Sequence, residues 1–308
     1  MRDTFIRTLT ELARDNDRIA LITGDLGFGV LDNFAATFPG QYINSGVAEQ
    51  NMTAIAAGMA LSGWKTYTYS IANFTTLRCL EQIRNDVCYH DADVCVVSVG
   101  GGFSYGQLGM SHFATEDLAI LRALPNLRIV APSELWEVED MTRELAANPG
   151  PSYLRIDKGV GGVERRDGEV ARLGKARIVR EGTDATIMTT GAIVSEAVKA
   201  TEQLAADGIE CRIVSHSSLK PLDVDAIVAA ATETGGIVTV EEHTIIGGLA
   251  AAVGETCLEQ GAAPRFFIRL GLRDCYPTIV GDQNYLRTAY GMDSASIAAA
   301  IKRGVFRK

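Results

Sequence analysis

The sequence has little positive charge, no long apolar run and no secretory leader pattern. Its formal net charge is −9 over 308 residues. This argues against a protein that binds nucleic acid or an anionic membrane, because both partners require a basic surface. No apolar run approaches the roughly 20 residues that span a bilayer. The N-terminal segment contains acids and lacks the apolar core of a signal peptide, so we expect an amphipathic first helix there.

Metal and nucleotide motifs are also missing. The six cysteines stand at positions 79, 88, 95, 211, 257 and 275. None has CxxC spacing and no His/Cys cluster resembles a zinc site, so we expect no metal site on this chain. Scattered cysteines in a long chain favour reduced thiols and a cytoplasmic protein. Because GK[ST] and GxGxxG are lacking, a P-loop and a Rossmann dinucleotide site are unsupported.

Short β-branched runs alternate with helical patterns, which predicts an α/β fold of mostly parallel sheets with helices on both faces. Predicted strands are Ile19–Gly24, Gln41–Asn44, Lys65–Ser70, Val94–Val99, Leu127–Ala131, Tyr153–Ile156, Ala185–Thr189, Glu210–Ser215, Gly236–Val240 and Phe266–Leu270. Predicted helices are Gln50–Ser62, Leu77–Tyr89, Glu116–Ala123, Leu135–Ala147, Ile193–Asp207, Val224–Thr234 and Leu249–Gln260.

A stretch rich in glycine and charge interrupts this alternation at residues 158–174. Such composition indicates a connection between domains. The length also fits two domains of roughly 150 residues each. We expect domains at residues 1–165 and 175–308, with a linker at 166–174.

Two side chains follow predicted strands at places where a cleft could form. Glu49 begins a helix rich in alanine and glycine, where the helix dipole favours a carboxylate. A simple helix cap is the alternative, and composition alone favours it. Phe74 lies between a strand and a helix and could face a cleft, although an ordinary core phenylalanine is the commoner case.

A glycine-rich loop follows the strand that ends near Val99, and loops at this end of a strand often bind ligands in α/β folds. It ends at His112, which could transfer a proton or serve a structural role. A second polar group, Glu241-Glu242-His243, follows another strand. Neighbouring residues of a strand point to opposite sides, so a metal site there is disfavoured and a turn into the next helix is expected.

Taken together, these segments resemble the C-terminal half of transketolase and of deoxyxylulose-phosphate synthase over nearly the whole chain. Five pieces occur in that family's order. They are GVAEQNMTAIAAGMAL, SIANFTTLRCLEQIRND, GMSHFATEDLAILRALPNLRIVAPSE, PSYLRI and IVTVEEHTIIGGLAAAVGE. The resemblance implies a pyrimidine-binding domain followed by a C-terminal domain, and the cofactor thiamine diphosphate.

The resemblance also implies roles for single residues. Glu49 matches the glutamate that hydrogen-bonds the pyrimidine of the cofactor and promotes its proton transfer, and Phe74 matches the aromatic residue that stacks on that ring. Asp25 matches an aspartate near the cofactor, and Leu77 stands where a second aromatic residue commonly flanks the pyrimidine. His112 matches a substrate-facing histidine. Arg2 and Arg155 match arginines that hold a sugar phosphate, whereas lone arginines are most often surface charges.

Two departures from the family pattern matter. The half that binds magnesium and diphosphate, marked by GDG and a later asparagine, is missing; GDLGFG at residues 24–29 does not replace it. We therefore expect a separate partner subunit to supply the metal ligands, in an α2β2 assembly. Gly100 and Leu108 stand where a substrate-binding histidine and aspartate are expected, so a specialised sugar donor or acceptor is indicated.

The expected activity is transfer of a two-carbon ketol unit between sugar substrates, by a chain that is active only with its partner. Another thiamine-diphosphate reaction is the alternative, such as deoxyxylulose-phosphate synthesis or the chemistry of a 2-oxoacid dehydrogenase beta subunit. The segment LRALPNLRIVAP favours the transketolase side. A non-catalytic scaffold is a third possibility, motivated by Gly100 and Leu108, but the joint presence of Glu49, Phe74 and His112 argues against it.

Overall fold

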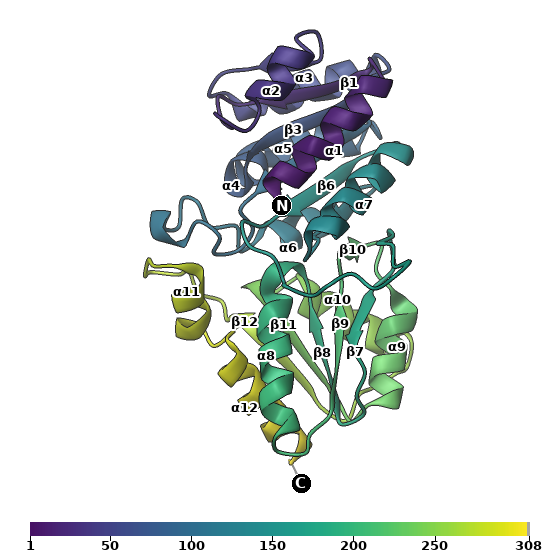
Figure 1. Ribbon diagram of the computed structural model, residues 1–308, viewed down its shortest axis with the longest axis vertical. Coiled ribbons are helices and arrows are strands. Elements are labelled where there is room, and N and C mark those ends of the chain that lie inside the picture. The colour runs from purple at the N-terminus through teal and green to yellow at the C-terminus, as the bar shows by residue number, and fades with distance from the viewer. Residues whose placement is uncertain (307–308) are drawn as a thin grey trace.

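The computed structural model describes residues 1–306, which form two α/β units stacked end to end (Figure 1). The N-terminal unit contains α1 (Arg2–Asp15), β1 (Ile19–Thr23), α2 (Asp32–Thr37), β2 (Tyr42–Asn44), α3 (Glu49–Leu61), β3 (Lys65–Ile71), α4 (Ala72–Thr75), the 3₁₀ turn η1 (Leu77–Cys79), α5 (Leu80–Gln82), the π-helical η2 (Ile83–Cys88), β4 (Val94–Val99), the 3₁₀ turn η3 (Gly106–Leu108), α6 (Asp117–Arg122), β5 (Arg128–Val130), α7 (Leu135–Ala147) and β6 (Ser152–Ile156).

The C-terminal unit follows a connection without helix or strand. It contains β7 (Arg177–Arg180), β8 (Ala185–Thr189), the 3₁₀ turn η4 (Gly191–Ile193), α8 (Val194–Ala205), β9 (Cys211–Ser215), β10 (Ser218–Lys220), α9 (Val224–Glu233), β11 (Ile237–Thr244), α10 (Leu249–Glu259), β12 (Phe267–Leu272), α11 (Gln283–Ala289) and α12 (Ser294–Val305).

The first sheet has the order β10-β5-β6-β4-β3-β1-β2, in which β10 alone runs antiparallel to its neighbour. Because successive side chains of a strand point to opposite faces, each strand serves two cores. Leu21 of β1 packs in the cluster under α1 and α7, whereas Ile22 packs in the cluster under α3. This two-sided burial explains why the strands are continuously apolar.

The second sheet has the order β12-β11-β8-β9-β7, parallel except for the edge strand β7. Ile187 of β8 packs with α8 and α12, while Met188 faces the opposite side with α9 and α10. Both units are therefore three-layered, and the fold class predicted from the sequence is confirmed.

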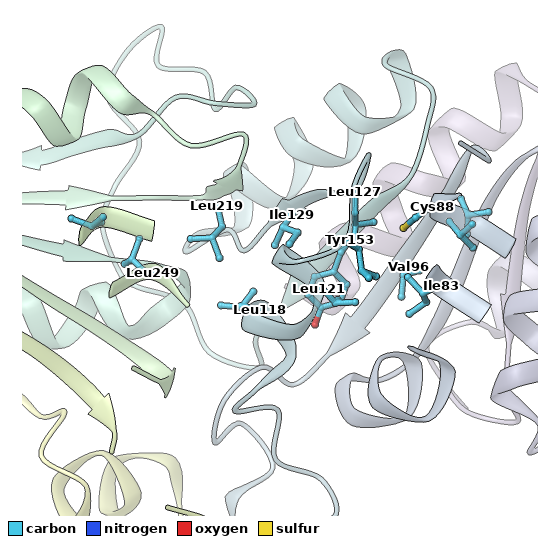
Figure 2. Close-up of a cluster of buried hydrophobic side chains, with 14 of the residues drawn as sticks. Ile83, Cys88, Val96, Leu118, Leu121, Leu127, Ile129, Tyr153, Leu219 and Leu249 are labelled. Atoms are coloured by element: carbon cyan, nitrogen blue, oxygen red, sulfur yellow. The ribbon is translucent and has the colours of Figure 1, made fainter. Parts of the chain in front are cut away.

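The two units share one hydrophobic cluster and one sheet. Figure 2 shows Leu219 and Leu249 of the C-terminal unit facing Leu118 and Ile129 of the N-terminal unit, and all four belong to one buried cluster. Strand β10 comes from the second half of the chain but pairs with β5 of the first sheet. Shared burial of this kind favours a fixed relation between the two units.

Ten predicted strands are present, with ends shifted by a few residues, and the amphipathic first helix is confirmed as α1. The single helix predicted at Leu77–Tyr89 is wrong, because this segment divides into η1, α5 and η2. The turn expected after Val240 is also wrong, since β11 continues to Thr244. Within residues 1–306, no helix is both long and apolar enough to cross a membrane.

Candidate active site

The carboxyl ends of the parallel strands in the first sheet place four of the predicted site residues along one edge. Asp25 follows β1, Glu49 begins the helix after β2, Phe74 lies just after β3, and His112 lies in the long loop after β4. In open α/β sheets the crevice outside the carboxyl ends of the strands is the usual ligand site. The topology therefore gathers these residues where a ligand can bind.

Glu49 is a buried carboxylate and not a helix cap. Its residue is 2% exposed. The cap position of α3 is Ala48, and no side-chain capping hydrogen bond forms there. Gly24, at the end of β1, leaves room for the glutamate, because a Cβ there would lie 3.2 Å from its Cγ. The carboxylate instead accepts a hydrogen bond of 2.7 Å from Arg78.

Phe74, His112 and Tyr105 form an aromatic row beside this carboxylate. The Phe74 and His112 rings meet edge to face with centroids 5.3 Å apart, and the Tyr105 ring lies 6.1 Å from His112. Partial burial lowers the pKa of His112 below its ordinary value. At neutral pH this favours the uncharged imidazole, which can accept or donate a proton.

Asp25 and Leu77 lie at the exposed side of the same edge. Asp25 has φ of 58°, a left-handed conformation that aspartate tolerates better than most residues. Its backbone and side chain both bond the side chain of Asn44, at 3.0 and 3.1 Å. Leu77 is 39% exposed. The structure therefore places both residues at the rim of the site.

Arg2 lies away from Glu49, at a cavity of about 360 Å³ that Tyr105 and Lys158 also line. The Lys158 ammonium stands 3.9 Å from the centre of the Tyr105 ring. Two cationic side chains at one cavity suit an anionic group. Tyr105 connects this cavity to His112, because its ring contacts both.

Arg155 is not part of that cavity. It is 4% exposed and lies between the two units. Its guanidinium donates to the carbonyl oxygens of Ala114 and Glu242 and pairs with Asp117 at 3.3 Å. Burial works against its charge, yet the Asp117 and Asp157 carboxylates raise the pKa of Arg155. This setting favours a structural role for Arg155 over the expected contact with a sugar phosphate.

The group Glu241-Glu242-His243 also serves structure. Glu241 accepts hydrogen bonds from Leu249 and Ala250 at the start of α10, at 2.8 and 2.9 Å. Glu242 accepts from Phe103 in the glycine-rich loop and pairs with Arg287. Within residues 1–306 no group of acids, histidines and cysteines has the arrangement of a metal site.

Three residues of the site were not singled out from the sequence. Arg78 could have been found, because it stands four residues after Phe74 and that spacing places two side chains on one helical face. Tyr105 and Lys158 meet only through tertiary structure. Local patterns give no signal for such a contact.

Two family models cover most of the chain. Residues 1–162 match the model described as "Transketolase, pyrimidine binding domain", and residues 174–297 match "Transketolase, C-terminal domain". The chain belongs to the transketolase family. Transketolases depend on thiamine diphosphate, and the site described above is the pyrimidine-binding half of such an enzyme.

Relatives of this transketolase chain are themselves separate subunits. One of the two kinds of subunit of an apulose-4-phosphate transketolase, from Phocaeicola vulgatus, is 38% identical over 96% of this chain and 94% of that protein. A 6-deoxy-6-sulfo-D-fructose transketolase subunit of Clostridium sp. (strain MSTE9) is 33% identical over 100% of this chain and 95% of that protein.

A solved structure named "Split gene transketolase, inactive beta4 tetramer" superposes with a TM-score of 0.88 at 32% identity, over 99% of this chain and 97% of that one. The chain is therefore a transketolase subunit of the split, beta type.

Proposed function

We propose that this chain binds the pyrimidine end of thiamine diphosphate and, with a partner chain, transfers a two-carbon ketol unit between anionic sugars. One observation is central to this proposal: the nearly buried carboxylate of Glu49 lies beside the aromatic ring of Phe74 at the carboxyl edge of the first sheet. We also propose that residues 1–165 form the cofactor-binding domain and that the second domain begins near residue 175.

The residues present fit the ring of the cofactor. An isolated buried carboxylate is unfavourable, so Glu49 needs a polar partner. We expect it to hold a proton at the pyrimidine N1′ and to orient the ring. Phe74 offers a flat apolar surface, and stacking adds about 0.5–1.5 kcal/mol beyond burial. Asp25 and Leu77 would bound the rim. When bound, thiamine diphosphate supplies the nucleophilic carbon and the electron sink.

A partner chain is expected to hold the diphosphate and Mg²⁺. The sequence lacks the GDG motif with its asparagine, and residues 1–306 offer no metal-binding cluster. Exposed apolar side chains follow the strand ends along the same edge, namely Phe28, Val47, Leu77 and Leu108. Apolar exposure next to an incomplete site suits a protein interface. We propose an α2β2 assembly in which the missing half covers this edge.

The anionic end of the substrate is assigned to the cavity with Arg2 and Lys158. The names of two relatives, an apulose-4-phosphate transketolase and a sulfofructose transketolase, both specify sugars with an anionic group. His112 lies between this cavity and Phe74, where it can hydrogen-bond a substrate hydroxyl or carbonyl. Arg155, which is already paired, takes no part in this assignment.

The test replaces Glu49 in the reconstituted complex. We expect Glu49→Gln to lower kcat by at least about 100-fold, in line with acid–base groups generally. Glu202→Gln, on the exposed side of α8, is the control and should keep full activity. The assay combines the chain with its diphosphate-binding partner, thiamine diphosphate and Mg²⁺, and follows ketol transfer.

Two results would contradict the proposal. Turnover by this chain alone would remove the need for a partner. Release of carbon dioxide from pyruvate, without ketol transfer between sugars, would favour the alternative thiamine-diphosphate chemistry. A complex that binds no cofactor in calorimetry would leave only the scaffold role.

A further inference from the structure

Glu49, Arg78 and Phe74 form a three-part stack at the centre of the site. The Arg78 Nη1 lies 2.7 Å from the Glu49 Oε2, and its Cζ lies 4.4 Å from the centre of the Phe74 ring. The Glu49 side chain is 3% exposed, whereas that of Arg78 is 45% exposed. The guanidinium therefore covers the carboxylate from the solvent side.

The backbone of Arg78 is fixed while its side chain can move. Gln50, on α3, donates a hydrogen bond of 3.1 Å to the Arg78 carbonyl oxygen. Phe74 contacts His112 edge to face, which limits the freedom of the ring. A half-exposed arginine has several rotatable bonds and lies at low cost in more than one position. The contact with Glu49 is thus one that a competing ligand can break.

A guanidinium and an aminopyrimidine satisfy this pair of residues in the same way. A guanidinium is planar, donates N–H groups in its plane and stacks on aromatic faces. An aminopyrimidine ring is also planar, and it would bond Glu49 at its edge and stack on Phe74. Because Glu49 is almost fully buried, little of its carboxylate is left for a second partner while Arg78 is in place.

We propose that Arg78 is an internal occupant of the pyrimidine position, which must swing out before an aminopyrimidine ring can bind. This inference depends on the proposed function, because it takes Glu49 and Phe74 as the pyrimidine site. Arg78 keeps the buried carboxylate paired while the chain has no cofactor. The closed position lowers the apparent affinity for the ring by the fraction of molecules that occupy it.

The experiment measures binding of 4-amino-5-hydroxymethyl-2-methylpyrimidine to the full chain by NMR titration. This probe lacks thiazolium and diphosphate, so no partner is needed for its recognition. We expect Arg78→Ala to bind it about two- to fivefold more tightly than the unchanged chain, the range set by a half-exposed ion pair with a cation–π contact. Arg84→Ala, an exposed arginine of the same segment, should leave the affinity unchanged.

A second measurement tests the contact without any ligand. In urea unfolding, Arg78→Ala should destabilise the chain, but it should have a smaller effect in a Glu49→Gln background. Such non-additivity is the signature of two side chains in contact. Additive effects would show that the pair does not form, and would overturn the inference.

The outcomes separate this inference from the proposed function. If Glu49→Ala abolishes binding of the probe while Arg78→Ala weakens it or leaves it unchanged, the pyrimidine site stands and the role of Arg78 is wrong. If neither the unchanged chain nor Arg78→Ala binds the probe, both the proposed site and its internal occupant are rejected. Tighter binding by Arg78→Ala alone, with Arg84→Ala unchanged, supports both.

Discussion

Glu242 of the second sheet accepts a hydrogen bond of 3.1 Å from the backbone N–H of Phe103, in the glycine-rich loop of the first sheet. The same carboxylate accepts hydrogen bonds from Gln283 and Arg287. Gly102 permits this approach, since a Cβ there would lie 2.5 Å from the Glu242 side chain. One side chain of the C-terminal unit thus holds the loop that ends at His112.

Replacing Glu242 should therefore destabilise the chain and loosen this loop. Removal of one partner from a buried ion pair leaves the other charge unpaired, so we expect Glu242→Ala to lower the free energy of unfolding by about 3–5 kcal/mol. Hydrogen exchange should accelerate over residues 100–112. Glu259→Ala, at an exposed site on α10, should stay within about 0.5 kcal/mol. An equally small effect at Glu242 would show that the buried pair does not hold the loop.

Tyr105 fills the space beside Gly100, so this glycine should not tolerate a side chain. Gly100 has φ of 89°, and a Cβ there would lie 2.2 Å from the Tyr105 ring. We expect Gly100→Ala to destabilise by about 2–4 kcal/mol through backbone strain and overpacking together. Gly29→Ala is the matched control, because Gly29 has a similar φ of 76° and nothing within 4 Å. Equal losses in thermal unfolding would mean that the Tyr105 ring moves aside freely.

The sequence predicted the strands well because both faces of each sheet are buried, which leaves continuous apolar runs. It did not predict β10, which has three residues and pairs with a strand about ninety positions earlier. Nor did it predict the division of Leu77–Tyr89, where tertiary contacts outweigh helix propensity.

The site shows the same contrast. Glu49, Phe74 and His112 follow strand ends, which a local pattern marks, and topology then gathers them. Arg155 was expected at a substrate phosphate, yet it lies among Asp117, Ala114 and Glu242. Its partners come from three distant segments, so no local signal could distinguish a buried bridging arginine from a ligand-binding one.

His216 gives the stability of the chain a specific pH dependence. It is fully buried, and desolvation lowers its pKa from 6.5 to about 4, although Asp223 opposes the shift. Between these values the unfolded chain binds a proton that the folded chain does not, so stability is lost as pH falls below 6.5. The total loss is about 3 kcal/mol.

Urea unfolding of the unchanged chain and of His216→Phe, at several pH values from 7.5 to 4.5, checks this. Asp157 and Glu241 have pKa values raised by burial, and they contribute the opposite slope in both proteins. The difference between the two proteins therefore isolates His216. Parallel pH profiles would mean that the histidine is protonated in the folded state.

Arg2 and Lys158 should determine recognition of an anionic sugar. Either Arg2→Leu or Lys158→Leu removes a charged donor from the cavity that Tyr105 connects to His112. Charge-assisted hydrogen bonds contribute about 1.5–3 kcal/mol, so KM for a sugar phosphate should rise about tenfold or more. KM for the neutral sugar should change by less than about twofold, because that ligand has no charge to lose. Steady-state kinetics of the reconstituted complex gives both constants.

Two further variants make this result specific. Arg14→Leu removes an exposed charge from the far end of α1, and it should leave both KM values unchanged, since the net charge alone has little effect over that distance in salt. Arg155→Leu should instead lower the melting temperature, because it breaks the buried pairing with Asp117. If Arg155→Leu raised KM for the sugar phosphate without loss of stability, while Arg2→Leu did not, the anion would bind at the buried arginine and the cavity assignment would be wrong.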